Sequence, residues 1–128
     1  MRIEHLAIYC ENLDLLRDFY TGYFGLECGS RYENRAKDFS SYFLRSKEGG
    51  ARLELMNLPN LPVGGTPNKC RGLAHIAISV GSKEQVDLLT EKLRSDGFKI
   101  LSEPRTTGDG YYESAVEDPE GNYVEITV

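Results

Sequence analysis

The chain carries an internal repeat, which constrains its fold more than any other feature. The segments Glu4–Cys10 and Ala74–Val80 both read x-His-aliphatic-Ala-Ile-x-x, and their histidines are 70 positions apart. A glutamate flanked by apolar residues follows late in each half, at Glu54 and at Glu125. The 128 residues therefore divide into two short halves with the same order of parts.

Each half is predicted to have the element order βαβββ, and the fold class is therefore α+β. Alternating residues predict a first strand at 2–10, and Asn12 or Asp14 is placed to cap a helix that runs to about Tyr23 and is closed by Gly25. The other expected strands are at about 27–34, 39–46, 51–58, 73–80, 98–102, 111–117 and 122–128, with a second helix at about 82–96 that Ser82 caps.

The two halves are expected to form one domain over residues 1–128. Module 1 covers about 1–58, the proline- and glycine-rich linker about 59–71, and module 2 about 72–128. Neither module alone buries enough apolar surface to be stable. We therefore expect the modules to pack on each other or on a partner chain.

Composition excludes several classes of function. The net charge of −5 argues against nucleic-acid binding, because phosphate contacts need a basic surface. No apolar run approaches the roughly 20 residues that span a bilayer. The first residues lack the apolar segment of a secretory signal, so we expect no membrane contact and a cytoplasmic location. The cysteines Cys10, Cys28 and Cys70 form no C-x-x-C pair, which argues against a disulfide framework and a thiolate zinc site.

Four predicted strands have one aliphatic face and one face of small or polar residues. The second face carries His5, Glu54, His75 or Glu125 and would line the concave side of a curved sheet. A single strand histidine is often only hydrogen-bonded, and a single strand glutamate is often only solvated. The repetition of both positions instead favours a site of two imidazoles and two carboxylates, a donor set that suits a divalent metal ion.

The same residues resemble the vicinal-oxygen-chelate superfamily, which includes glyoxalase I, fosfomycin- and bleomycin-resistance proteins, methylmalonyl-CoA epimerase and extradiol dioxygenases. The segments that carry the resemblance are His5–Ile8, Phe19–Tyr20, Phe24–Leu26, Leu53–Leu55, Leu73–Ala77 and Glu117–Glu125. The resemblance implies a curved, barrel-like mixed sheet with helices on the outside. It also implies a homodimer and a divalent ion, which would be Zn, Ni or Co, with Mn or Fe as alternatives.

The resemblance further implies the chemistry of glyoxalase I. Glu125 would be the catalytic base, with Glu54 as its symmetric counterpart. The substrate would be a 2-oxoaldehyde–thiol hemithioacetal, formed from methylglyoxal and glutathione or another thiol. The reaction would pass through a metal-stabilised enediolate to an S-2-hydroxyacyl thiol, as in methylglyoxal detoxification.

Substrate contacts are expected at Tyr9, Met56, Arg105 and Tyr111. Tyr9 stands where bacterial glyoxalase I proteins tend to have an arginine that helps to hold glutathione, so the identity of the thiol stays open. The segment Gly108–Tyr112 is either a loop over the site or a hairpin entry. Two other functions also stay open: a module that binds a small molecule such as an antibiotic without turnover, and an epimerase or thiol transferase.

Overall fold

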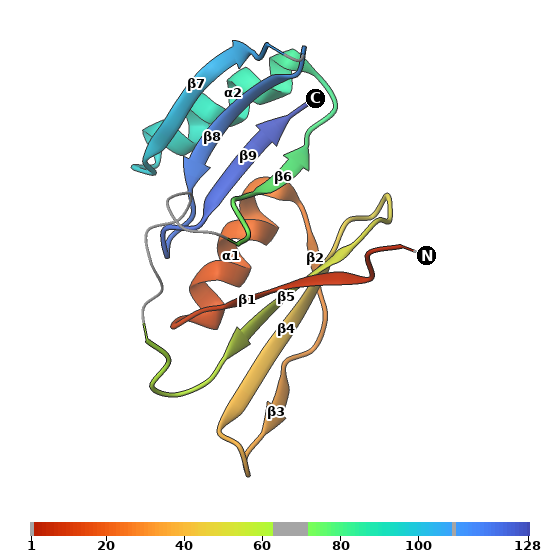
Figure 1. Ribbon diagram of the computed structural model, residues 1–128, viewed down its shortest axis with the longest axis vertical. Helices are drawn as coiled ribbons and strands as arrows, with labels where there is room; N and C mark the ends of the chain where they lie inside the picture. Colours follow the sequence, from red (N-terminus) through yellow and green to blue (C-terminus); the bar gives the residue numbers. More distant parts are fainter. Residues whose placement is uncertain (1, 63–71, 109) are drawn as a thin grey trace. The chain divides into compact units, whose positions relative to one another are not determined.

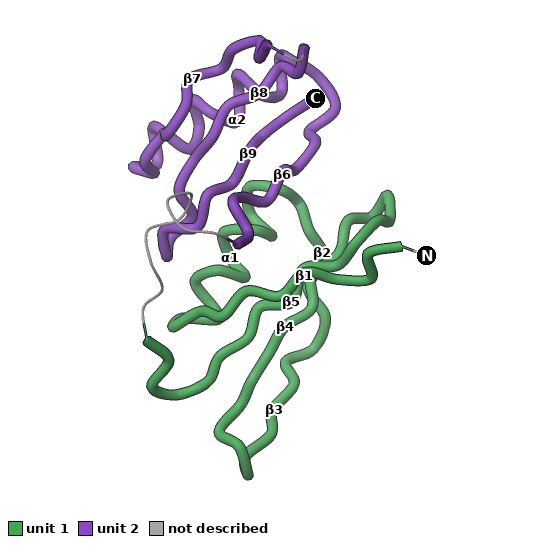
Figure 2. Tube along the Cα trace, in the orientation of Figure 1, with its two compact units in different colours: residues 1–63 green, residues 64–128 purple. Residues whose placement is uncertain are grey.

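The computed structural model describes residues 2–62, 72–108 and 110–128. The chain divides into two units, Met1–Val63 and Gly64–Val128, each with one helix and one mixed sheet (Figure 2). The elements of the first unit are β1 (His5–Tyr9), α1 (Leu13–Phe24), β2 (Glu27–Cys28), β3 (Tyr32–Asn34), β4 (Phe39–Arg45) and β5 (Arg52–Asn57). Those of the second are β6 (Ile76–Ser79), α2 (Lys83–Ser95), β7 (Ile100–Thr106), β8 (Tyr112–Glu117) and β9 (Tyr123–Thr127).

The sheet of the first unit has the strand order β1-β5-β4-β2, and β3 pairs with β4. Strands β1 and β5 are parallel, while the other pairs are antiparallel. Helix α1 packs against one face of this sheet (Figure 1). Its side chains Leu16 and Tyr20 are fully buried, as are Leu44 of β4 and Leu55 of β5, so the core lies between helix and sheet.

The predicted helix boundaries are confirmed by their caps. The side chain of Asn12 accepts a hydrogen bond from the backbone of Leu15 at 3.0 Å. Gly25 ends α1 with φ of 65°, a left-handed conformation that glycine adopts without a steric penalty. Ser82 caps α2 by accepting a hydrogen bond from Gln85 at 3.3 Å.

The second unit repeats the arrangement with the strand order β6-β9-β8-β7, in which β6 and β9 are parallel. Helix α2 packs on one face of this sheet, and its side chains Val86 and Leu93 are fully buried with Val116 and Ile126 of the sheet. The predicted α+β class is confirmed, with two mixed sheets and two helices among the described residues. The curved, barrel-like closure of the two modules stays a prediction.

Several predicted boundaries are wrong. The strand expected at 27–34 is two short strands, β2 and β3, separated by residues 29–31. The strand expected at 98–102 begins later and extends to Thr106, with two register irregularities against β8. Most of the linker expected at 59–71 lies outside the described residues, and so does Cys70. Within the described ranges, no helix is long and apolar enough to cross a membrane.

Candidate metal centre

The first unit brings His5 and Glu54 together. Nε2 of His5 lies 3.7 Å from Oε2 of Glu54, across the parallel strands β1 and β5. Ala7 is the register partner of Glu54, so the histidine approaches the glutamate diagonally from two positions earlier on β1. The Glu54 side chain is 13% exposed and that of His5 40%, which places the pair at the surface of the sheet.

The other ring nitrogen of His5 also has a partner. Nδ1 lies 2.5 Å from the carboxylate of Glu4, which in turn forms an ion pair with Arg52. The hydrogen bond with His5, together with Arg52, lowers the pKa of Glu4. The ring of Phe43 stands edge-on to His5, with centroids 5.4 Å apart. A carboxylate on one ring nitrogen is typical of metal-binding histidines, because it fixes the ring and directs the second nitrogen at the metal.

The second unit repeats the pair with His75 and Glu125. Nε2 of His75 lies 3.2 Å from Oε2 of Glu125, whose side chain is 17% exposed. The register partners of Glu125 are Ala77 on β6 and Ala115 on β8, so small residues flank the carboxylate on both sides. In the first unit, the β4 partner of Glu54 is the large side chain of Phe43. Glu125 therefore has smaller neighbours than Glu54.

The surroundings of His75 differ from those of His5. Its ring lies 5.9 Å from that of Tyr123, and Ala74 precedes it where Glu4 precedes His5. Burial and the nearby carboxylate of Glu125 raise the pKa of Tyr123. The turn before β9 is fixed by the buried Asp118, which accepts hydrogen bonds from the backbone of residues 120 and 122 at 3.0 and 2.9 Å.

Each unit therefore supplies one imidazole and one carboxylate on the face opposite its helix. The predicted alternation is confirmed: Leu53 and Leu55 are buried, as are Val124 and Ile126, on the helix side of β5 and β9. Within the described ranges, no three His, Cys, Asp or Glu side chains are grouped as a metal site. Each pair contributes two of the four predicted ligands, and their donor atoms suit Zn, Ni, Co, Mn or Fe.

The residues predicted to contact substrate also divide between the units. Tyr9 and Met56 are register partners on the His5–Glu54 face of the first sheet. Arg105 lies in β7, beyond the end of the strand expected at 98–102, with its guanidinium 3.6 Å from Glu113 of β8. Tyr111 is exposed and precedes β8, with Thr107 accepting its backbone N–H at 3.0 Å. Strands β7 and β8 on either side of this segment are antiparallel, with Thr106 opposite Tyr112, which fits a hairpin entry.

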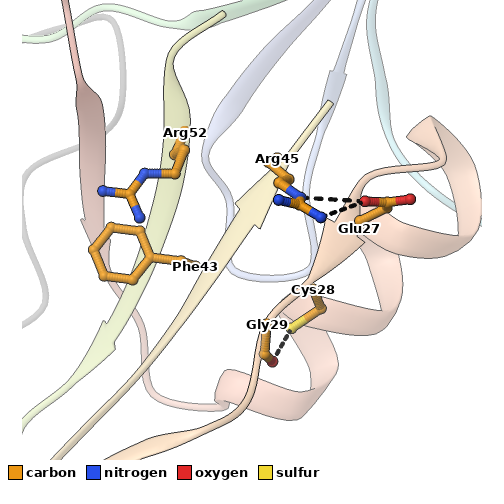
Figure 3. A pocket seen from close by; sticks show the side chains of 6 residues that line it. All are labelled: Glu27, Cys28, Gly29, Phe43, Arg45 and Arg52. Atoms are coloured by element: carbon orange, nitrogen blue, oxygen red, sulfur yellow. Dashed lines mark hydrogen bonds and ion pairs between the residues drawn. The ribbon is translucent and has the colours of Figure 1, made fainter. Parts of the chain in front are cut away.

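A hollow of about 650 Å³ adjoins the first pair (Figure 3). Phe43, Arg45 and Arg52 line it together with Glu27, Cys28 and Gly29. The sequence reasoning missed these residues, and also Glu4, because the repeat does not conserve them: Ala74 corresponds to Glu4 and Tyr123 to Arg52. The one signal available for Glu4 was its place directly before the predicted ligand His5.

The chain matches the Glyoxalase/Bleomycin resistance protein/Dioxygenase superfamily over residues 2–126. The uncharacterized protein YqjT of Bacillus subtilis (strain 168) is 30% identical over 128 residues, covering 97% of this chain and 96% of that protein. These matches extend over both halves of the repeat.

Solved structures show the same similarity. A possible glyoxalase from Bacillus cereus superposes with a TM-score of 0.74 at 28% identity, covering 100% of this chain and 99% of that one. The trypanothione-dependent glyoxalase I of Leishmania major superposes with a TM-score of 0.78 at 24% identity, covering 99% and 86%. At this identity, the similarity to the Leishmania major protein shows a shared fold and nothing more.

Proposed function

Because the chain belongs to the glyoxalase/bleomycin resistance protein/dioxygenase superfamily, we propose that it is a metal-dependent lyase or isomerase with glyoxalase I-like activity. The observation that carries this proposal is the repeated pair, His5 with Glu54 and His75 with Glu125. In the proposal the two pairs supply the four ligands of one metal ion, either from one chain or from two subunits. The carboxylate of Glu4 on His5 supports a ligand role for that imidazole.

In the proposed reaction, Glu125 takes the proton from the carbon that bears sulfur in a hemithioacetal of methylglyoxal. It returns that proton to the neighbouring carbon, so a hydroxy ketone becomes a hydroxyacyl thioester with no external oxidant or reductant. Its alanine neighbours Ala77 and Ala115 support this role, because a base must move between two carbons. The divalent ion, when bound, supplies Lewis-acid polarisation of two adjacent substrate oxygens.

The remaining site residues orient and screen the reacting atoms. Glu54, which faces Phe43 in register, has less room and is assigned to holding the site in place. His5 and His75 provide imidazoles whose Nε2 atoms already face carboxylates. Tyr9 and Met56 lie beyond Glu54 on the same face and are proposed to contact the substrate.

Metal analysis combined with turnover tests this function. Protein reconstituted with Zn²⁺, Ni²⁺ or Co²⁺ is expected to bind stoichiometric metal, and His75→Ala is expected to lose it. Glu125→Gln is expected to lower turnover of methylglyoxal with glutathione by about 10²–10⁴-fold. The matched control is Glu103→Gln, because Glu103 is an exposed carboxylate of β7 that pairs with Arg94.

Three outcomes separate this function from its alternatives. A well-folded, reconstituted protein that binds no divalent ion refutes it. Calorimetric binding of small molecules without product favours a binding module. Metal binding without turnover of hemithioacetals, but with solvent deuterium uptake into a 2-oxo substrate, favours an epimerase.

We also propose that the protein is a homodimer, as is common for this fold. Mixing His5→Ala with His75→Ala protein distinguishes a site within one chain from a site shared between subunits. A shared site regains about a quarter of wild-type activity on random exchange, because half of the dimers are mixed and each has one intact site. A site within one chain regains none.

A further inference from the structure

The hollow of the first unit lies on the same sheet face as the His5–Glu54 pair. Phe43 connects the two features: it is the register partner of Glu54, and its ring is edge-on to His5 at 5.4 Å. The hollow extends from Phe43 over β4 and β2 to Arg45 and Glu27, which are also register partners. Its volume of about 650 Å³ falls within the range of small-molecule sites.

Two guanidinium groups border this hollow (Figure 3). Arg52 lies over the ring of Phe43, with its central carbon 4.2 Å from the ring centroid. Stacking on the ring and the ion pair with Glu4 hold this guanidinium in place. Arg45 pairs with Glu27 at 3.1 Å, and its side chain is 70% exposed.

The lining holds two guanidinium groups, those of Arg45 and Arg52, and the carboxylate of Glu27, while Glu4 beside the lining pairs with Arg52. Each guanidinium has five N–H donors, and the ion pairs with Glu27 and Glu4 use only some of them. The remaining donors match the paired oxygens of an incoming carboxylate.

We propose, on the basis of the proposed function, that this hollow binds a carboxylate on the thiol component of the substrate. Arg45 and Arg52 hold that carboxylate, while the reacting carbons extend past Phe43 to the His5–Glu54 pair. The two arginines then determine which thiol is accepted. The repeat does not conserve Arg52, because the second unit has Tyr123 at the corresponding position.

Three thiols of similar size and different charge test this specificity. Methylglyoxal hemithioacetals of 3-mercaptopropionate, 2-mercaptoethanol and cysteamine carry a carboxylate, a hydroxyl and an ammonium group respectively. With metal-reconstituted protein, kcat/KM is expected to be about tenfold higher for the carboxylate than for the hydroxyl, and lowest for the ammonium. The double variant Arg45→Gln/Arg52→Gln is expected to bring the three values together.

The matched control is Arg94→Gln, which removes a guanidinium that pairs with Glu91 and Glu103 on the second unit. This variant is expected to keep the wild-type order of the three thiols. Circular dichroism of all variants checks that they fold, and exposed ion pairs of this kind contribute little to stability.

A binding measurement without metal separates this inference from the proposed function. Amide resonances of Gly29 and Phe43 in the metal-free protein are expected to shift with 3-mercaptopropionate and to stay unchanged with cysteamine or in the double variant. If these shifts occur but no turnover is found, the hollow still binds a carboxylate, and only the proposed enzyme function is refuted. Turnover without a charge preference, or the absence of these shifts, overturns the inference.

Discussion

The carboxylate of Glu4 lies 2.5 Å from Nδ1 of His5, whereas Nε2 of the same ring faces Glu54 at 3.7 Å. The two nitrogens of one imidazole thus face two different carboxylates. The second unit has Ala74 in place of Glu4, and the side chain of His75 is about as exposed as that of His5. The two halves of the repeat therefore present their histidines in different ways.

This difference predicts that Glu4 supports metal binding through His5. Glu4→Ala is expected to weaken the affinity for Zn²⁺ by about 10–100-fold, because the ring loses the partner that keeps Nε2 unprotonated and directed at the site. Glu4→Gln keeps a neutral acceptor and is expected to lose less. Competition titration with a chelator measures both affinities.

The tautomer of His5 in the metal-free protein provides an independent measurement. Nitrogen NMR is expected to find the neutral tautomer with its proton on Nδ1 in the wild type, and a mixture of the two neutral tautomers in Glu4→Ala. Glu33→Ala removes a carboxylate that pairs with Arg31 at 3.3 Å and serves as the control. Wild-type affinity together with an unchanged tautomer in Glu4→Ala would contradict the prediction.

Two buried hydroxyls between α2 and β8 predict unequal costs of substitution. Oγ1 of Thr90 lies 2.6 Å from the carbonyl of Val86 and 2.6 Å from Oγ of Ser114. Thr90→Val leaves the Ser114 hydroxyl buried without this partner and is expected to lower the free energy of unfolding by about 1–3 kcal/mol. Ser114→Ala leaves Thr90 bonded to Val86 and is expected to cost about 0.5–1.5 kcal/mol.

Urea unfolding of both single variants and of the double variant measures this coupling. The double variant is expected to cost less than the two single variants together, because it leaves no hydroxyl unpaired at this place. Additive costs would show that the two hydroxyls do not depend on each other.

Sequence periodicity predicted the parts of the fold that local rules determine. Strand alternation placed His5 and Glu54 on the face opposite the buried Leu53 and Leu55, because a strand between helix and solvent must separate apolar from polar residues. The end of α1 followed from Gly25, since the left-handed conformation there favours glycine. Because the chain repeats, each strand or helix assigned in one half was also assigned at the equivalent position of the other half.

The parts that the sequence did not predict depend on register between distant strands. Phe43 meets Glu54 because β4 and β5 pair in one particular alignment, and nothing local to either strand specifies it. Arg45 and Glu27 are brought together in the same way. The later start of β7 accompanies irregular pairing with β8, which a simple alternation pattern does not encode.

Gly22 inside α1 and Gly25, which ends it, predict opposite effects of the same substitution. Gly22 is an exposed residue inside the helix, so Gly22→Ala is expected to raise the free energy of unfolding by about 0.5–1 kcal/mol. Gly25 has φ of 65°, a conformation that alanine adopts only with strain. Gly25→Ala is therefore expected to lower the free energy of unfolding by about 1–2 kcal/mol. An added Cβ would meet no atom within 4 Å at either place, so the backbone alone determines the sign. Thermal and urea unfolding measure both, and equal signs would contradict the assignment.

Burial predicts slow chemistry at the thiol of Cys28. Desolvation raises its pKa, Arg17 opposes this effect, and Asp14 and Asp18 add to it. In a Cys70→Ser background, the pH at which a disulfide reagent labels Cys28 at half its maximal rate is expected to lie above that of a free cysteine. Arg17→Gln is expected to raise this midpoint further, because it removes the nearby positive charge that favours the thiolate. Arg94→Gln, in the second unit, is expected to leave the midpoint unchanged. A midpoint at or below that of free cysteine would contradict the desolvation of this half-buried thiol.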